Sequence, residues 1–262
     1  MTPSEAVENA GWIAPRLHPF AQDVGAVVPP GFAAYARILH PAWTRWDPKA
    51  REVRWSEVAE WSGRTIHPEV QFHSIAQPIR GREVGPSRWN GEPHAGTLSA
   101  GQATALAELL ASHTTTPEAC WFCLWEGYGH LHSGGMAQQT VVFAWGPRPL
   151  VWLRLWAARR RLRRIKPRRP IGARVNLPYR GYLLFTGSVR DATGWEDGPN
   201  LWWPDDRAWC VASEIDFPYT YVGGSRELID AILMHPALEA LSAGLDDGIR
   251  YDSDRLNWSG TS

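Results

Sequence analysis

Residues 200–224, NLWWPDDRAWCVASEIDFPYTYVGG, limit the possible folds of this chain more than any other stretch. They contain three Trp, two Tyr and one Phe among short apolar runs, and they end in a Gly-Gly pair. Aromatic and β-branched residues are typical of strands that pack against a core. A helix-like pattern begins directly after the glycines. The stretch therefore predicts buried sheet structure that leads into a helix.

Three segments have the start signals and apolar spacing of helices. Residues 99–113 begin with Ser99 and Gln102 at the S-x-x-Q spacing of a capping box. Residues 226–234 follow Ser225, which we expect to cap that helix, and the short segment 56–62 begins with Ser56 in the same role.

Residues 120–126, CWFCLWE, have bulky apolar side chains at successive positions. This pattern is typical of a central strand that is covered on both faces. Residues 32–40 fit either a strand or a short helix, and the alternation along them favours a strand. Further strands are predicted at 139–145, 174–178, 181–189 and 208–216. Short turns join most of these strands, which favours an α+β fold with a mostly antiparallel sheet and helices packed on one face.

The length of 262 residues and the hydrophobic content of 44% suit a single globular domain over 1–262, with a basic excursion at about 150–170. The sequence begins with a polar segment rather than an apolar leader, and no apolar window is long enough to cross a bilayer. Three cysteines, an odd number, suit a reducing compartment. We therefore expect a cytoplasmic protein.

The net charge of zero conceals one strongly basic region. Between Glu126 and Asp191 there is no Asp or Glu, and this interval holds 13 of the 27 basic residues. Its densest part contains Arg159, Arg160, Arg161, Arg163 and Arg164. Residues 157–169 are candidates for binding nucleic acid or an acidic membrane surface through phosphate neutralisation. The alternative is a solvated Arg-rich excursion without a ligand.

Four carboxylates in the second half form the main candidate for a catalytic site: Asp205, Asp206, Glu214 and Asp216. On one strand Glu214 and Asp216 would share a face, and such a cluster could hold a divalent metal or divide acid and base roles. The alternative is structural. In that case Asp205 and Asp206 cap a turn, while Glu214 or Asp216 pairs with an arginine of the basic region.

Two further groups of residues match binding chemistry. Gly223, Gly224 and Ser225 precede a helix, where free backbone amides suit an anion such as phosphate; ordinary helix capping is the alternative. Cys120 and Cys123, with His130 and His132 nearby, resemble a zinc ligand set. On a strand, however, the two cysteines would point to opposite faces and could not share one ion. No cofactor is predicted, although a divalent metal is compatible with these groups.

The segments CWFCLWEGYG (120–129), LPYRGYLLFTG (177–187) and 199–225 together resemble a group of uncharacterised actinobacterial proteins. That group has no assigned activity, so the resemblance supplies no catalytic residue. A fainter similarity is to the SUKH-type immunity proteins, which are α+β binding modules with aromatic-rich strands. This similarity implies a protein partner rather than a reaction.

Two functions follow from these observations. The first is a non-catalytic cytoplasmic binding protein, of the immunity type or similar. The second is an enzyme with a carboxylate-centred, metal-assisted site for a phosphate-bearing or other anionic substrate. The enzyme requires the four carboxylates to meet in a pocket with His67, His73 or Arg180. The binding protein requires dispersed carboxylates and an exposed aromatic surface.

Overall fold

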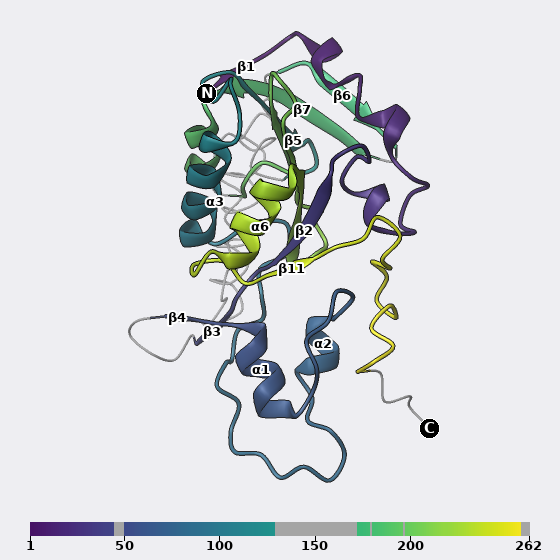
Figure 1. The fold of residues 1–262 in the computed structure, drawn as a ribbon, viewed down its shortest axis with the longest axis vertical. Helices are drawn as coiled ribbons and strands as arrows, with labels where there is room; N and C mark the ends of the chain where they lie inside the picture. Colours follow the sequence, from purple (N-terminus) through teal and green to yellow (C-terminus); the bar gives the residue numbers. More distant parts are fainter. Residues whose placement is uncertain (45–49, 129–171, 179, 196, 258–262) are drawn as a thin grey trace, which may run out of the picture.

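An antiparallel sheet of nine strands forms the centre of the computed structural model (Figure 1). The structure describes residues 1–44, 50–128, 172–178, 180–195 and 197–257. The strand order is β1-β7-β5-β8-β9-β10-β2-β11, with β6 also paired to β7. The strands of this sheet are β1 (Thr2–Pro3), β2 (Ala34–Leu39), β5 (Cys120–Trp125), β6 (Arg174–Leu177), β7 (Arg180–Gly187), β8 (Leu201–Pro204), β9 (Cys210–Ala212), β10 (Tyr219–Gly224) and β11 (Ala240–Ser242).

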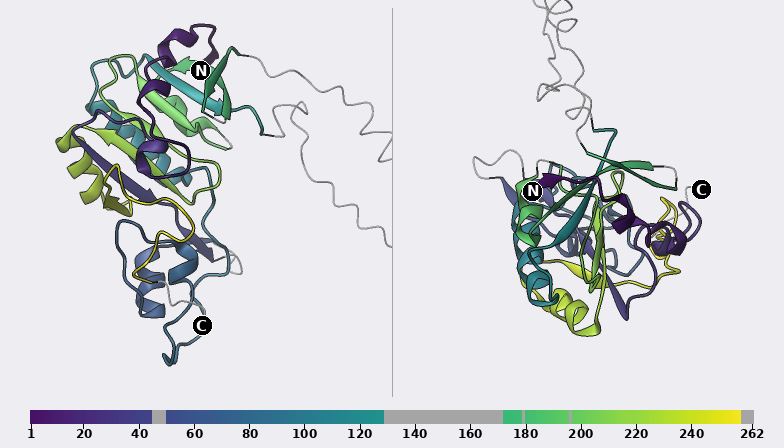
Figure 2. Two further views of the ribbon diagram at one scale, coloured as in Figure 1. Left: turned by 90° about the vertical axis from the view of Figure 1, so that its right-hand side faces the viewer. Right: turned by 90° about the horizontal axis from the view of Figure 1, so that it is seen from above.

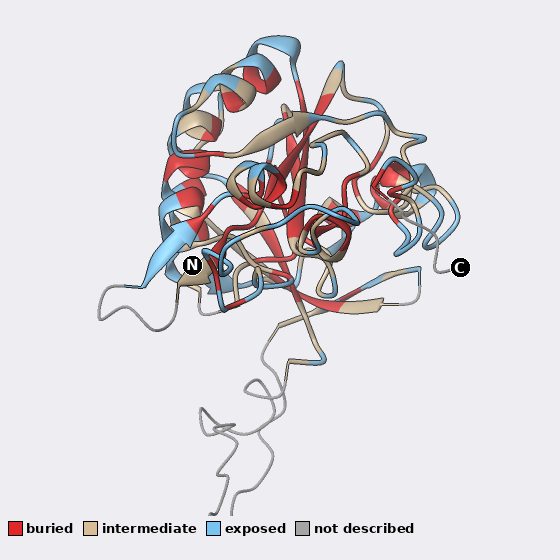
Figure 3. Cartoon of the chain, turned by 90° about the horizontal axis from the view of Figure 1, so that it is seen from below, coloured by how far each residue is buried: buried red, intermediate tan, exposed pale blue. Residues whose placement is uncertain are grey.

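The sheet separates two hydrophobic clusters, so most of its strands are buried on both faces (Figure 3). Side chains alternate between the clusters along each strand, as the pleat of a strand requires. In β8, Trp202 joins the cluster on the helical face and Trp203 joins the opposite one. The tryptophan pair of the 200–224 stretch therefore lies in the core, with Trp202 2% and Trp203 1% exposed.

One face of the sheet is covered by α3 (Ala100–Ser112), α6 (Arg226–Met234) and the 3₁₀ helix η4 (Val189–Gly194) (Figure 1). The Ser99 hydroxyl accepts a hydrogen bond from the Gln102 amide, and the Gln102 side chain bonds back to the Ser99 amide. Ser225 caps α6 by accepting from the Leu228 amide. These capping residues and the α+β fold class are confirmed.

The opposite face is covered by irregular chain from both termini. The N-terminal part forms the 3₁₀ helices η1 (Val7–Ala10), η2 (Ala14–Arg16) and η3 (Val24–Ala26). The C-terminal segment after β11 crosses the same side and then continues down past α2 (Phe72–Ile75) (Figure 1). A bridge between Asp23 and Gly248 joins the two coverings.

A small lobe extends from one end of the sheet (Figure 2, left). It contains α1 (Trp55–Ser62), α2 and the two-stranded sheet of β3 (Ala42–Thr44) and β4 (Arg51–Val53). The prediction that Ser56 caps the first helix is wrong, because α1 already begins at Trp55. The Glu239 carboxylate accepts hydrogen bonds from the Trp55 and Ser56 amides at 2.6 and 2.7 Å, so a distant residue binds the free N–H groups of this helix.

The predicted strands at 32–40, 120–126, 174–178 and 181–189 match β2, β5, β6 and β7. The predicted strand 139–145 and the basic excursion at about 150–170 lie outside the described residues. None of the described helices has the length and apolar character needed to span a membrane.

Candidate functional site

The four candidate carboxylates lie at opposite ends of the β8–β9 hairpin. Asp205 and Asp206 form the turn after β8, whereas Glu214 and Asp216 follow the end of β9. The strand predicted to reach 216 stops at Ala212, because the chain turns there and the Phe217 amide bonds to the Glu214 carbonyl at 3.0 Å. The expectation that all four carboxylates meet in one site is therefore wrong.

Asp206 organises the turn at its end of the hairpin. Its carboxylate accepts hydrogen bonds from the Thr114 hydroxyl, from the hydroxyl and amide of Thr115, and from the Ala208 amide, at 2.7–3.1 Å. Burial acts to raise the pKa of Asp206, but these hydrogen bonds outweigh it and hold the pKa below its usual value. Asp205 accepts from the Trp121 indole N–H at 3.1 Å. Both carboxylates thus have structural partners.

Glu214 and Asp216 share Arg180, which lies at the start of β7. The guanidinium Nε donates to Glu214 at 3.2 Å, and Nη2 donates to Asp216 at 3.0 Å. Burial raises the pKa of Glu214, while the positive charge of Arg180 opposes that shift. The structural alternative predicted this pairing of Glu214 or Asp216 with an arginine of the basic region. The ion pairs connect β7 to the turn after β9.

Gly223 and Gly224 are the last two residues of β10, where they pair with Tyr35 and Ala34 of β2. Both are buried. A Cβ at Gly223 would lie 2.6 Å from a ring carbon of Phe32, so these positions require glycine for close packing. Ser225 uses its hydroxyl as a helix cap. The glycines therefore do not present their backbone at a helix start, as the anion-site prediction requires.

Cys120 and Cys123 belong to opposite faces of the sheet, which rules out a metal site shared by the two thiols. Burial raises the pKa of Cys120 to about 12, and it also raises the pKa of Cys123 and of the third cysteine, Cys210. All three thiols therefore stay protonated. The remaining candidates His130, His132, Arg159, Arg160, Arg161, Arg163 and Arg164 lie outside the described residues.

The structure forms a groove of about 370 Å³ where the lobe meets the end of the sheet. Its walls come from four segments that are distant in sequence: α2, residues 92–95, the turn 216–218, and the C-terminal segment 249–251. Such a concave surface between two parts of a molecule is a usual location for a binding site.

Aromatic rings form much of the groove lining. His73 of α2 stacks on Tyr251, with ring centroids 3.7 Å apart and planes within 2°. Phe217 and Tyr219 form a second aromatic pair, with centroids 5.0 Å apart. Tyr219 is buried, but Tyr251 is 68% exposed. The groove therefore presents one large aromatic face to solvent beside an apolar floor.

The charged residues in the groove lining are both acidic. Glu92 and Asp216 are exposed there, and the lining contains no Lys or Arg. Burial lowers the pKa of His73, although the nearby Asp254 carboxylate acts in the opposite direction. Glu92 and Asp216 are therefore the charged side chains of the lining, and Asp216 is paired with Arg180 outside it.

A buried carboxylate holds the C-terminal wall of the groove in place. Asp254 accepts hydrogen bonds from His67 Nε2 at 2.6 Å, from the Gln71 amide at 3.0 Å and from the Asn257 amide at 3.0 Å. Burial acts to raise the pKa of Asp254, but these donors outweigh it and lower the pKa. This junction ties the segment that carries Tyr251 to the lobe.

Of the groove residues, His73 and Asp216 are candidates from the sequence pattern, whereas Glu92 and Tyr251 are not. No local pattern marks these two residues, because they meet only through the tertiary fold. The chain matches no protein-family model, no curated protein and no solved structure.

Proposed function

We propose that this chain is a non-catalytic binding protein whose groove receives a basic segment of a protein partner. The observation that supports this proposal is the groove itself, because an exposed aromatic ring and two carboxylates line it without a basic residue. The enzyme hypothesis requires the four candidate carboxylates to meet in one site. Because they lie at opposite ends of the β8–β9 hairpin, the binding hypothesis is favoured.

Aromatic and acidic groups together are complementary to an arginine or lysine side chain. A cation placed over the face of Tyr251 would interact with the ring quadrupole. Its N–H groups would lie near Glu92 and Asp216, which are acceptors for charge-assisted hydrogen bonds. Arginine suits this setting best, because its planar guanidinium can stack and bond to a carboxylate at the same time.

Asp216 is already partly neutralised by Arg180 at 3.0 Å. Glu92 has no ion-pair partner within the part of the chain that the structure describes. A basic residue of the partner would therefore form its strongest ion pair in the groove with Glu92. An anionic substrate, as in the enzyme hypothesis, would be repelled by the same carboxylates.

A protein partner fits the groove better than a small metabolite does. The groove is open, and its aromatic wall continues onto the exposed surface at Tyr251. A cytoplasmic immunity-type role, in which this chain captures and inhibits another protein, is one form of such binding. In that role the partner would insert a basic side chain into the groove.

A peptide-display selection tests this proposal. Random peptides would be selected on the full chain and then compared on Glu92→Lys and on Glu108→Lys, a matched control on the exposed side of α3. We expect enriched peptides that carry Arg or Lys, bind the control, and lose binding to Glu92→Lys. Acidic peptides, peptides insensitive to Glu92→Lys, or no enrichment would each overturn the proposal.

A further inference from the structure

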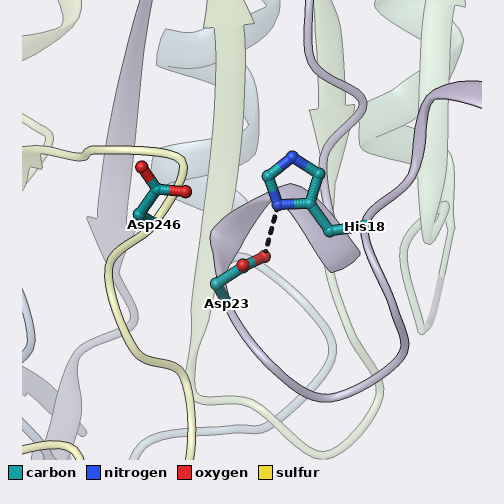
Figure 4. A group of neighbouring side chains, drawn as sticks. All are labelled: His18, Asp23 and Asp246. Atoms are coloured by element: carbon teal, nitrogen blue, oxygen red, sulfur yellow. Dashed lines mark hydrogen bonds and ion pairs between the residues drawn. The ribbon is translucent and has the colours of Figure 1, made fainter.

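Three potential metal ligands meet where the N-terminal covering contacts the C-terminal segment (Figure 4). They are His18, Asp23 at the start of η3, and Asp246 in the turn after β11. The ligand atoms of all three lie within 4.8 Å of one another, and His18 Nδ1 is 2.9 Å from Asp23 Oδ1. No local sequence pattern marks these residues, because they come from opposite ends of the chain.

We propose that His18, Asp23 and Asp246 bind one divalent transition-metal ion of the zinc type. A ring nitrogen with two carboxylate oxygens is a donor set that Zn²⁺ accepts, whereas Mg²⁺ and Ca²⁺ prefer oxygen donors alone. Three protein ligands leave a fourth position for water in a tetrahedral site. This inference does not depend on the function proposed for the groove.

The backbone holds the Asp246 turn against η3. The Val24 amide donates to the Asp247 carbonyl at 3.1 Å, and the Gly25 amide donates to the Leu245 carbonyl at 3.0 Å. These bonds lie on either side of Asp246, so its Cα position is fixed relative to Asp23. The fold therefore brings the ligand-bearing segments together before any ion binds.

The His18 ring is held by the same loop. Its own amide donates to the Gly25 carbonyl at 3.0 Å. A Cβ at Gly25 would lie 2.5 Å from His18 Nδ1, so the ring packs directly on the glycine. Any larger residue at position 25 would displace the ring from Asp23.

The ligand atoms require only a small adjustment to hold an ion. Bond lengths near 2.1 Å place the ligands of a tetrahedral zinc site roughly 3.4 Å apart. Asp246 is exposed and makes no hydrogen bond or ion pair with other described residues, so its side chain can rotate inward. The neighbouring Asp247 carboxylate instead accepts a hydrogen bond from the Gly244 amide at 2.7 Å, so Asp246 is the candidate ligand of this turn. In the bound state His18 would carry its proton on Nε2.

Calorimetric titration of the chelator-treated full chain with Zn²⁺ tests the site. We expect a site of one ion per chain, with affinity about tenfold weaker in Asp246→Asn and in His18→Gln. Asp252→Asn is the matched control, because Asp252 lies on the same segment, is 67% exposed and, among the described residues, forms its ion pair with Arg250. This control should bind Zn²⁺ like the unmodified chain.

Two results would overturn the inference. One is the absence of zinc binding by the unmodified chain. The other is equal binding by Asp246→Asn and by the unmodified chain, which would place the ion at other histidines. Asp246 is exposed, so its substitution by Asn keeps the fold, and circular dichroism of the variant would verify this.

Discussion

His73 and Tyr251 stack face to face, with ring centroids 3.7 Å apart and an interplanar angle of 2°. The first ring comes from α2 in the lobe and the second from the C-terminal segment. Their contact closes one wall of the groove and leaves Tyr251 68% exposed. A ring with so much exposed surface contributes little to the core, which makes it a suitable contact for a partner.

Replacement of Tyr251 by Ala should weaken binding far more than stability. We expect the free energy of unfolding to fall by less than about 1 kcal/mol, because the ring is exposed. The affinity for a selected basic peptide should fall about tenfold, because the aromatic face is lost. Tyr251→Phe keeps that face and should bind normally. Equal peptide affinity of Tyr251→Ala and the unmodified chain would show that the Tyr251 ring does not contribute to binding.

His40 should make the protein less stable in mild acid. Burial lowers the pKa of His40 to about 4 from its usual 6.5, while the hydrogen bond to the His94 carbonyl opposes this shift. Since that carbonyl can only accept, His40 Nδ1 donates to it, and Nε2 accepts from the Thr220 hydroxyl at 2.8 Å. Protonation of Nε2 would reverse that second bond, so the Thr220 hydroxyl would have to accept and turn its proton toward Ser213 Oγ, 2.7 Å away.

Between pH 6.5 and about 4, His40 is therefore protonated in the unfolded chain but neutral in the folded chain. Stability falls as the pH drops through this window, by about 2 kcal/mol from His40 alone between roughly pH 7.5 and 5. Urea unfolding at several pH values measures this loss of unfolding free energy. His40→Asn should have a correspondingly flatter pH profile, and an unchanged profile would show that another group causes the effect.

Arg180 should be important for stability, because its removal leaves the largely buried Glu214 carboxylate without its cation. We expect Arg180→Met to lower the free energy of unfolding by about 3 kcal/mol. The double variant Arg180→Met/Glu214→Gln should recover part of that loss. Arg174→Met is the control, since Arg174 is 61% exposed in its pair with Glu126 and should cost less than about 1 kcal/mol. Equal losses in the two single variants would contradict this interpretation.

Gly223→Ala should destabilise the protein by about 2 kcal/mol through overpacking. The added Cβ would meet Phe32 at 2.6 Å and Tyr35 at 2.8 Å. Gly194→Ala is a matched control, because no atom lies within 4 Å of a Cβ at that position and the cost should stay within about 0.5 kcal/mol. Thermal unfolding of both variants measures the difference, and similar melting temperatures would refute the packing argument.

Local signals were sufficient to predict much of the fold. The capping box at Ser99 and the cap at Ser225 were recognisable because their partners lie three residues away. The apolar run of β5 indicated a central strand, and Cys120 and Cys123 lie on opposite faces as the strand period requires. Each of these features depends on interactions or periodicities within a few residues.

The predictions failed where distant residues decide the local structure. Helix α1 begins earlier than its sequence indicates, because Glu239 binds its first amides. Strand β9 ends at Ala212, and Glu214 in the following turn is paired with Arg180. The groove depends on tertiary contacts in the same way, since Glu92 and Tyr251 meet only in the folded chain.

The groove hypothesis is tested most directly by the dissociation constant of a selected arginine-bearing peptide for Glu92→Gln. This substitution removes one negative charge from the groove and keeps the size of the side chain. We predict that the peptide binds Glu92→Gln about five to ten times more weakly than the unmodified chain, while Glu108→Gln on the opposite side of the sheet binds it normally. Equal dissociation constants for Glu92→Gln and the unmodified chain would contradict the proposal that this groove binds a basic partner segment.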